Sequence, residues 1–163
     1  MLSKKVETAL NDQIQKEIYS SYLYLSMAAQ FASMNLNGFA HWMKVQTDEE
    51  TKHAMKIYEH VNDRNGRVIL QQIDAPPSSW KSAKDMFQDA YQHETKVTES
   101  INKIVELART EKDNATEVFL QWFVNEQVEE EASTNNILQK LQVLGDNPSA
   151  LLMLDAELNK RPP

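Results

Sequence analysis

The sequence has no cysteine, only three glycines and no long run of apolar residues. Without cysteine the chain cannot form disulfides. A membrane-spanning helix needs about 18 or more consecutive apolar residues, and none of the apolar runs approaches that length. The first residues, MLSKKVETALNDQ, contain no apolar run of the kind that a secretory signal requires. We therefore expect a cytoplasmic protein that does not enter a membrane.

Positive charge is also scarce, because 17 lysines and arginines stand against 24 aspartates and glutamates, which leaves a net charge of -7. Such a chain offers no basic surface for the phosphates of nucleic acids or for anionic lipids. The charge therefore argues against nucleic acid and membrane partners. Cations are the more natural ligands.

The few glycines and prolines divide the chain into long segments whose apolar residues recur with the period of an α-helix. The pattern predicts helices over 4–34, 38–64, 81–110, 114–144 and 148–159. Asn147 and Pro148 introduce the last of these as its N-cap and first helical residue. With 163 residues, of which 41% are hydrophobic, the chain suits one domain over 1–163.

Four of these predicted helices are much longer than the ~10 to 14 residues usual in globular proteins, which favours helices that lie side by side along their whole length. Short connections at 35–37 and near 111–113 predict two antiparallel hairpins, whereas residues 67–80 are numerous enough to run the length of the molecule. The predicted fold class is all-α: a four-helix bundle with a long crossover between its second and third helices and a short fifth helix.

Acidic residues interrupt the apolar stripe of each long predicted helix near its middle. In chain order they are Glu17, then Glu50 with His53, then Glu94, and finally Glu126 and Glu130. Counted from the hairpin turns, these positions lie at the same height within about one helical turn, at ~1.5 Å per residue. We therefore expect the carboxylates of Glu17, Glu50, Glu94 and Glu130 and the imidazole of His53 to converge near the middle of the bundle.

Carboxylates buried together need neutralisation, because burial disfavours their charged form and neighbouring like charges raise each other's pKa. Protons or basic side chains can supply it, but no lysine or arginine lies on the four stripes near the acids. Two divalent cations would balance four carboxylates, and oxygen-rich ligation with one imidazole favours iron or manganese. The alternative at each single position is a solvated glutamate. Four acids at matched heights are much harder to obtain by chance.

A glutamate on each of two helices with Glu-x-x-His on the other two is the design of di-iron carboxylate bundles. Glu50-Thr51-Lys52-His53 supplies one such motif, whereas Gln127 and Glu130 stand where the second is expected. The segments YSSYLYLSMAAQF, DEETKHAMKIYEH and QWFVNEQVEEE, together with the short last helix, resemble those of the non-haem bacterial ferritins along the whole chain. Bacterioferritins carry a second histidine and a haem-ligating methionine. Thr51 and Lys52 occupy the positions beside Glu50 here, so haem is not expected.

The resemblance implies a dinuclear iron centre whose first iron is held by Glu17, Glu50 and His53. It implies that Glu94 and Glu130 hold the second iron, with Glu50 bridging the two. A neighbouring third iron site would comprise Glu49, Glu126, Glu129 and Glu130. Two further residues resemble supporting members of the family's site: Gln127 is a hydrogen-bonding partner of the ligands, and Tyr24 is a one-electron donor beside them.

The resemblance also implies a ferroxidase that oxidises Fe(II) to Fe(III) with dioxygen or hydrogen peroxide and stores the ferric mineral in a homo-oligomeric shell of 24 subunits. Residues 148–159 are similar to the element that packs around the fourfold axes of such shells, although their leucines can also pack on their own bundle. Two alternatives stay open. One is a di-iron peroxidase or oxygenase of the rubrerythrin kind, and the other is a non-catalytic interaction protein whose buried acids are only hydrogen-bonded.

Overall fold

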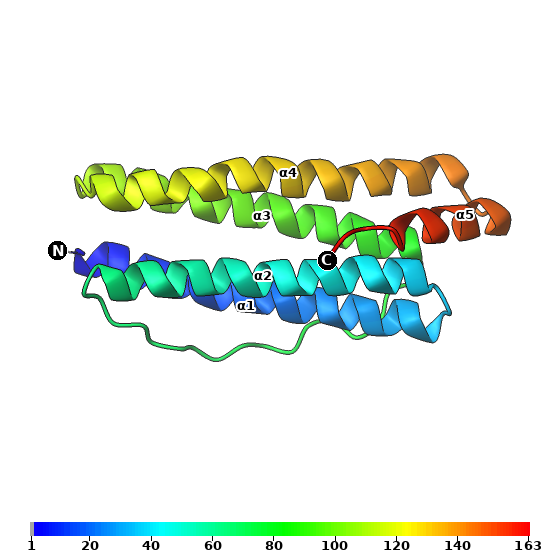
Figure 1. The fold of residues 1–163 in the computed structure, drawn as a ribbon, viewed down its shortest axis with the longest axis horizontal. Coiled ribbons are helices and arrows are strands. Elements are labelled where there is room, and N and C mark those ends of the chain that lie inside the picture. Colours follow the sequence, from blue (N-terminus) through cyan, green and yellow to red (C-terminus); the bar gives the residue numbers. More distant parts are fainter. Residues whose placement is uncertain (1) are drawn as a thin grey trace.

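A computed structural model describes residues 2–163, which form an elongated bundle (Figure 1). Its helices are α1 (Lys4–Ser33), α2 (Asn37–Asp63), α3 (Ala83–Thr110), α4 (Asn114–Leu144) and α5 (Pro148–Leu158). The predicted all-α bundle with a short fifth helix is confirmed, and every helix begins and ends within two residues of its predicted bounds. Within residues 2–163, no helix has both the length and the apolar character needed to cross a membrane.

Side-chain caps determine where four of the helices begin, and Ser3 provides the first of them for α1 by accepting from Val6 N at 3.3 Å. Ser82 Oγ accepts a hydrogen bond from the backbone N–H of Asp85 at 3.1 Å, so α3 begins at Ala83, two residues after its predicted start. Asp113 Oδ1 accepts from Thr116 N at 3.1 Å at the start of α4. Asn147 caps α5 in the same way, ahead of a proline at the first helical position.

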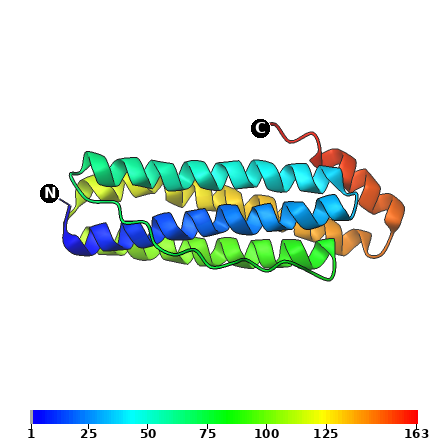
Figure 2. The same cartoon turned by 90° about the horizontal axis from the view of Figure 1, so that it is seen from below.

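The long connection between α2 and α3 runs along the outside of the bundle beside α1 (Figure 2). Polar side chains of α1 satisfy its backbone groups. Asn11 accepts from Ile69 N at 2.7 Å and donates to Arg67 O at 3.0 Å. Gln30 pairs with both the N–H and the carbonyl of Trp80 at 2.8 Å. Because this connection returns the chain to the end where α2 began, α2 and α3 run in the same direction.

Helix α5 packs against the beginning of α2 and supplies the cap that α2 lacks. Leu36, the N-cap residue of α2, offers no side-chain acceptor, and Asp155 of α5 instead accepts from Phe39 N at 2.9 Å. This approach requires glycine at position 38, because a Cβ there would lie 1.7 Å from the backbone oxygen of Asp155. The short helix is therefore fixed to the bundle by α2.

The apolar core is divided into two clusters, one at each end of the bundle. The cluster next to α5 includes Phe31, Phe39, Met43 and Phe87. The cluster at the opposite end includes Leu10, Ile57, Ile101 and Phe123. Between the two clusters lies a polar layer of buried side chains, enclosed by apolar packing on both sides: Gln13, Glu17, Gln46, Glu50, His53, Glu94, Gln127 and Glu130.

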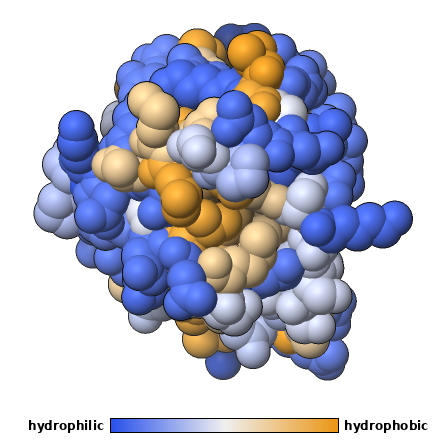
Figure 3. Space-filling model, turned by 90° about the vertical axis from the view of Figure 1, so that its right-hand side faces the viewer, coloured by the Kyte–Doolittle hydropathy of each residue, from blue (hydrophilic) through white to orange (hydrophobic). Residues whose placement is uncertain are grey.

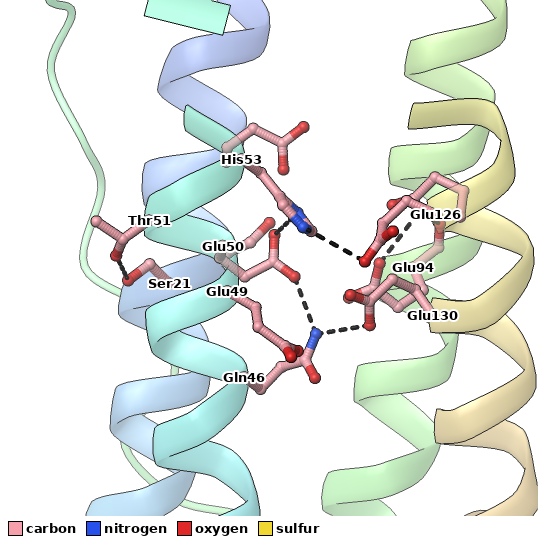
Figure 4. A network of polar contacts seen from close by, with 12 residues as sticks. Ser21, Gln46, Glu49, Glu50, Thr51, His53, Glu94, Glu126 and Glu130 are labelled. Carbon is pink, nitrogen blue, oxygen red and sulfur yellow. Dashed lines mark hydrogen bonds and ion pairs between the residues drawn. The ribbon is translucent and has the colours of Figure 1, made fainter. Parts of the chain in front are cut away.

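Helices α2 and α4 are separated more widely than the pairs α1/α2, α3/α4 and α1/α3. No Cα atom of α2 lies within 8 Å of one of α4, whereas each of the other three pairs approaches within that distance. Long side chains from both helices fill the space between them, as Figure 4 shows at the level of the polar layer. This separation leaves room for groups of ligand atoms between the helices.

Candidate metal centre

The polar layer brings together one acidic residue from each long helix. Glu17 comes from α1, Glu50 and His53 from α2, Glu94 from α3 and Glu130 from α4. Each of these side chains belongs to a residue that is at most 4% exposed. Glu50 and His53 lie one helical turn apart on the same face of α2, so both point across the gap toward α4 (Figure 4).

The ligand atoms of these residues form two groups that share Glu50. Glu17, Glu50 and His53 make the first group, and Glu50, Glu94 and Glu130 make the second. Within each group one ligand atom of every member lies within 4.8 Å of the others. His53 Nδ1 is 3.5 Å from Glu50 Oε2. The carboxylate of Glu50 thus belongs to both groups.

Within residues 2–163, no lysine or arginine forms an ion pair with Glu17, Glu50, Glu94 or Glu130. Glutamine amides donate to these acids instead. Gln46 Nε2 bonds to Glu50 Oε1 at 3.1 Å and to Glu130 Oε2 at 2.6 Å, which ties α2 to α4 (Figure 4). Amides orient the carboxylates without cancelling their charge.

Burial raises the pKa of Glu17 and of Glu50 well above the usual range, and repulsion from neighbouring carboxylates raises both further. The same two causes raise the pKa of Glu130 to about 8. Burial also raises the pKa of Glu94, against hydrogen bonds from Tyr24 and Gln127 that favour its charged form. Without a cation the cluster therefore retains protons, and a divalent cation can replace them.

A chain of hydrogen bonds connects Glu17 to the surface between α1 and α3. Lys16 Nζ donates to Ser100 Oγ at 2.7 Å, and Ser100 Oγ donates to Gln13 Oε1 at the same distance. Gln13 Nε2 then donates to Glu17 Oε1, again at 2.7 Å. The other oxygen of this carboxylate, Glu17 Oε2, is buried and has no hydrogen-bond partner among residues 2–163. A buried carboxyl oxygen without a partner, inside a group of ligand atoms, is available to a metal ion.

Tyr24 and Gln127, the two supporting residues expected from the sequence, both contact Glu94. The hydroxyl of Tyr24, fully buried, donates to Glu94 Oε1. Gln127 Nε2 donates to Glu94 Oε2 at 3.1 Å and lies 3.2 Å from Thr98 Oγ1. At the expected second Glu-x-x-His, Gln127 therefore stands in the glutamate position as a hydrogen-bond donor, and Glu130 stands in the histidine position.

The residues expected to form a third site are arranged less closely. Glu126 Oε1 lies 3.8 Å from His53 Nε2, and these two residues form a third group of ligand atoms with Glu130. Glu49 and Glu129 belong to none of the three groups. Glu129 is exposed, and Glu49 pairs with Arg161 at 2.5 Å. The structure thus places His53, which the sequence assigned to the dinuclear centre alone, beside the third-site acids.

Three polar residues of the layer were not predicted to have a role. Gln13 and Gln46 each precede an interior acid by four residues, so helical spacing places them on the same face as Glu17 and Glu50. That spacing is a usable signal in the sequence. Arg161 carries no such signal, because it lies 112 residues from Glu49 and meets it only through the fold.

The set of donors fits iron. Carboxylate oxygens predominate and one imidazole is present. The chain has no cysteine, so no thiolate is available as a ligand. Hard oxygen ligands with a single imidazole suit iron and manganese, and anionic oxygen ligands favour Fe(III) over Fe(II). The donor set of this centre therefore suits iron.

Comparison with known proteins leads to one family. A family model described as a ferritin-like domain matches residues 7–144. The bacterial non-heme ferritin of Bacteroides fragilis is 39% identical over 161 residues, covering 99% of this chain and 100% of that protein. The bacterial non-heme ferritin of Campylobacter jejuni is 40% identical over 155 residues, covering 95% of this chain and 93% of that one.

Solved structures agree with these relatives. The open pore ferritin from the hyperthermophilic archaeon Archaeoglobus fulgidus matches with a TM-score of 0.99 and 52% identity, over 99% of this chain and 100% of that chain. The resemblance to non-haem ferritins that the sequence motifs indicated is therefore confirmed. By full-length sequence and by fold, the chain belongs to the ferritin family.

Proposed function

We propose that this protein stores iron: it binds Fe(II) at the two groups that share Glu50, oxidises it to Fe(III) and transfers the product to a mineral inside a shell of like subunits. The observation that carries the proposal is the burial of four carboxylates, without a basic partner, in two ligand groups that share one acid. Membership of the ferritin family supports it. The proposal takes residues 1–163 as a single domain. A cytoplasmic location suits a chain without cysteine.

Iron is the substrate of the proposed ferroxidase reaction. Each Fe(II) loses one electron, so two ions supply two electrons to one oxidant. Dioxygen with two protons then becomes hydrogen peroxide, and hydrogen peroxide with two protons becomes two molecules of water. The contribution of the chain is to hold both ions through Glu50 and to surround them with carboxylates, which stabilise the higher charge of Fe(III).

The supporting residues have separate roles in this proposal. Tyr24, whose hydroxyl contacts the proposed iron ligand Glu94, can lend the oxidant one further electron, which a later Fe(II) returns to it. Gln127 orients the same carboxylate from the opposite oxygen. Glu126, together with Glu49, Glu129 and Glu130, provides a third iron position between the dinuclear centre and the store.

Storage requires a container, and the end of the bundle that carries α5 provides a surface for assembly. Val143, Met153 and Leu152 are 88%, 75% and 60% exposed there. Figure 3 views the molecule from this end and shows apolar residues gathered within a polar surround. Exposed apolar surface of this kind marks an interface between proteins. We propose that it joins copies of the chain into a shell of 24 subunits.

Aerobic loading with a ferrous salt, followed by sizing and iron counting, tests the proposal. We expect a large particle that retains many more iron ions per subunit than the two or three that the candidate centre could bind. A particle that retains only two or three irons per subunit would instead favour a di-iron peroxidase or oxygenase. A protein that takes up no Fe(II) under anaerobic conditions would favour a non-catalytic interaction protein.

The Glu50→Ala variant identifies the centre in the same assay. Because Glu50 is the only acid shared by both groups, its removal should slow Fe(II) oxidation in stopped-flow experiments at least about tenfold. Glu59→Ala, which removes an exposed acid from the same helix, is the matched control and should retain the wild-type rate. Equal rates in the two variants would show that oxidation takes place elsewhere.

A further inference from the structure

The chain that follows α5 returns to α2 and is held there through Arg161. The guanidinium lies 4.3 Å from the centre of the Trp42 ring, and Nη1 donates to Trp42 O at 3.2 Å. The backbone oxygen of Arg161 lies 2.8 Å from His41 Nε2. Figure 1 shows the chain after α5 turning back along α2, and Figure 2 shows that its end stands off the side of the bundle. The segment is therefore anchored by several independent contacts.

The second nitrogen of this guanidinium reaches an acid of the proposed third iron site. Arg161 Nη2 lies 2.5 Å from Glu49 Oε2, and the two side chains are 19% and 34% exposed. Glu49 directly precedes Glu50, and its label in Figure 4 lies beside Gln46 at the edge of the polar layer. The carboxylate of Glu49 is thus paired with the guanidinium of Arg161. A metal ion at the proposed third site would compete with this guanidinium for the carboxylate.

We propose that Arg161 controls the third iron site by occupying Glu49, so that docking of the C-terminal segment and binding of a third metal ion through Glu49 exclude each other. The inference rests on the proposed function, whose third iron position includes Glu49. Reciprocity of coupled binding then requires that a metal ion at Glu49 weakens docking of the segment, as docking weakens binding of the metal ion.

The chemistry of arginine suits this role. Its guanidinium is planar and permanently charged, so it can stack on an indole and pair with a carboxylate at the same time. Ion pairs near the surface are weak when both side chains are free to move. Here the stacking on Trp42 and the bond to its carbonyl restrain the arginine before it meets Glu49. The restraint makes the pair a stronger competitor than an ordinary surface pair.

Arg161 is also a positioning residue rather than a general source of positive charge. Lys160 is adjacent, exposed and forms no side-chain hydrogen bond or ion pair within the described residues. Arg161→Ala and Lys160→Ala therefore remove the same charge from the same segment, and only the first removes the partner of Glu49. The two variants separate a specific contact from a general change in electrostatic field.

Anaerobic calorimetric titration of the assembled apoprotein with Zn(II), a redox-inert probe, tests the inference. We expect two tight binding events per subunit in every protein, and a weaker third event that tightens about fivefold or more in Arg161→Ala. Lys160→Ala should match the wild type. The double variant Glu49→Gln/Arg161→Ala should lose the gain, because the acid that the arginine releases is no longer there.

The outcomes distinguish the two levels of the proposal. Equal third-site affinity in wild type and Arg161→Ala, or an equal gain in Lys160→Ala, overturns the role of Arg161 and leaves the dinuclear centre intact. A gain that persists in the double variant also overturns it, since the effect then does not pass through Glu49. Absence of the two tight events from the wild type overturns the proposed function, and the role of Arg161 falls with it.

Discussion

Glutamine amides, not bases, hold the interior carboxylates of this bundle. Gln13 donates to Glu17, and Gln46 donates to both Glu50 and Glu130. A neutral amide fixes the direction of a carboxylate oxygen and leaves its negative charge available. Removing an amide should therefore disturb binding of iron more than it disturbs the fold.

Gln13 offers the clearest test at the scale of a residue. Three successive hydrogen bonds, from Lys16 to Ser100, from Ser100 to Gln13 and from Gln13 to Glu17, all donate in the direction of Glu17. Hydrogen bonds connected in this way strengthen one another in a buried site. Replacing Gln13 by leucine keeps the volume and removes the donor. We expect the KM for Fe(II) oxidation to rise about tenfold or more, measured from initial rates against Fe(II) concentration.

A matched control for Gln13→Leu is available on the same helix. Gln15→Leu removes an amide whose bond, to Gln72 O at 3.4 Å, leads away from the centre. It should leave KM unchanged. A Gln13→Leu variant with the wild-type KM and a wild-type melting temperature would show that the amide does not position Glu17.

At the scale of helices, the sequence predicted most of the architecture because periodicity and capping residues act locally. The height of the acids followed from counting residues from each turn, since an α-helix rises by a fixed ~1.5 Å per residue. On the fourth helix, helical spacing alone allows either Trp122 or Phe123 to face the core. The structure buries Phe123 and leaves Trp122 39% exposed, because Phe123 packs within the apolar cluster at that end.

His60 links α2 to α4 and makes the stability of that contact depend on pH. Its ring stacks on Phe119 with 3.9 Å between centres, and its Nε2 lies 3.1 Å from Thr116 Oγ1. Burial lowers the pKa of His60 below 6.5, and nearby Arg64 lowers it further. The unfolded chain therefore binds a proton that the folded chain resists, and the free energy of unfolding falls as pH falls below about 6.5.

The His60→Gln variant tests this account by removing the titrating ring. The melting temperature of the apoprotein, followed by circular dichroism at about pH 7 and about pH 5.5, should fall less in the variant than in the wild type. His41→Gln removes a histidine from the opposite end of α2 and should retain the wild-type difference. A variant His60→Gln with the full pH dependence would contradict the account.

At the scale of the whole molecule, contacts between distant segments could not be predicted from the sequence. The pairing of Arg161 with Glu49 and the cap that Asp155 gives to α2 each join positions more than a hundred residues apart. No periodic pattern marks such pairs, because they depend on where α5 docks and on the rotamers of single side chains. The polar layer could be predicted, because the apolar stripes of four helices each contain an acid at the same height.

Assembly is the property of the whole molecule that α5 most directly tests. Met153 is 75% exposed on the apolar end of the bundle, so an aspartate there would place a charge in the proposed interface. We expect Met153→Asp to shift the protein to smaller species in sedimentation velocity, whereas Met153→Leu should keep the wild-type particle. An unchanged particle in Met153→Asp would show that this surface is not part of the interface.

Acids from four helices meet in the polar layer, and we propose that together they hold a pair of iron ions. Anomalous diffraction at the iron absorption edge, from crystals soaked anaerobically in Fe(II), measures this directly. We predict two peaks in each subunit, one enclosed by Glu17, Glu50 and His53 and the other by Glu50, Glu94 and Glu130. Iron peaks confined to surface acids, with none in the polar layer, would contradict the account.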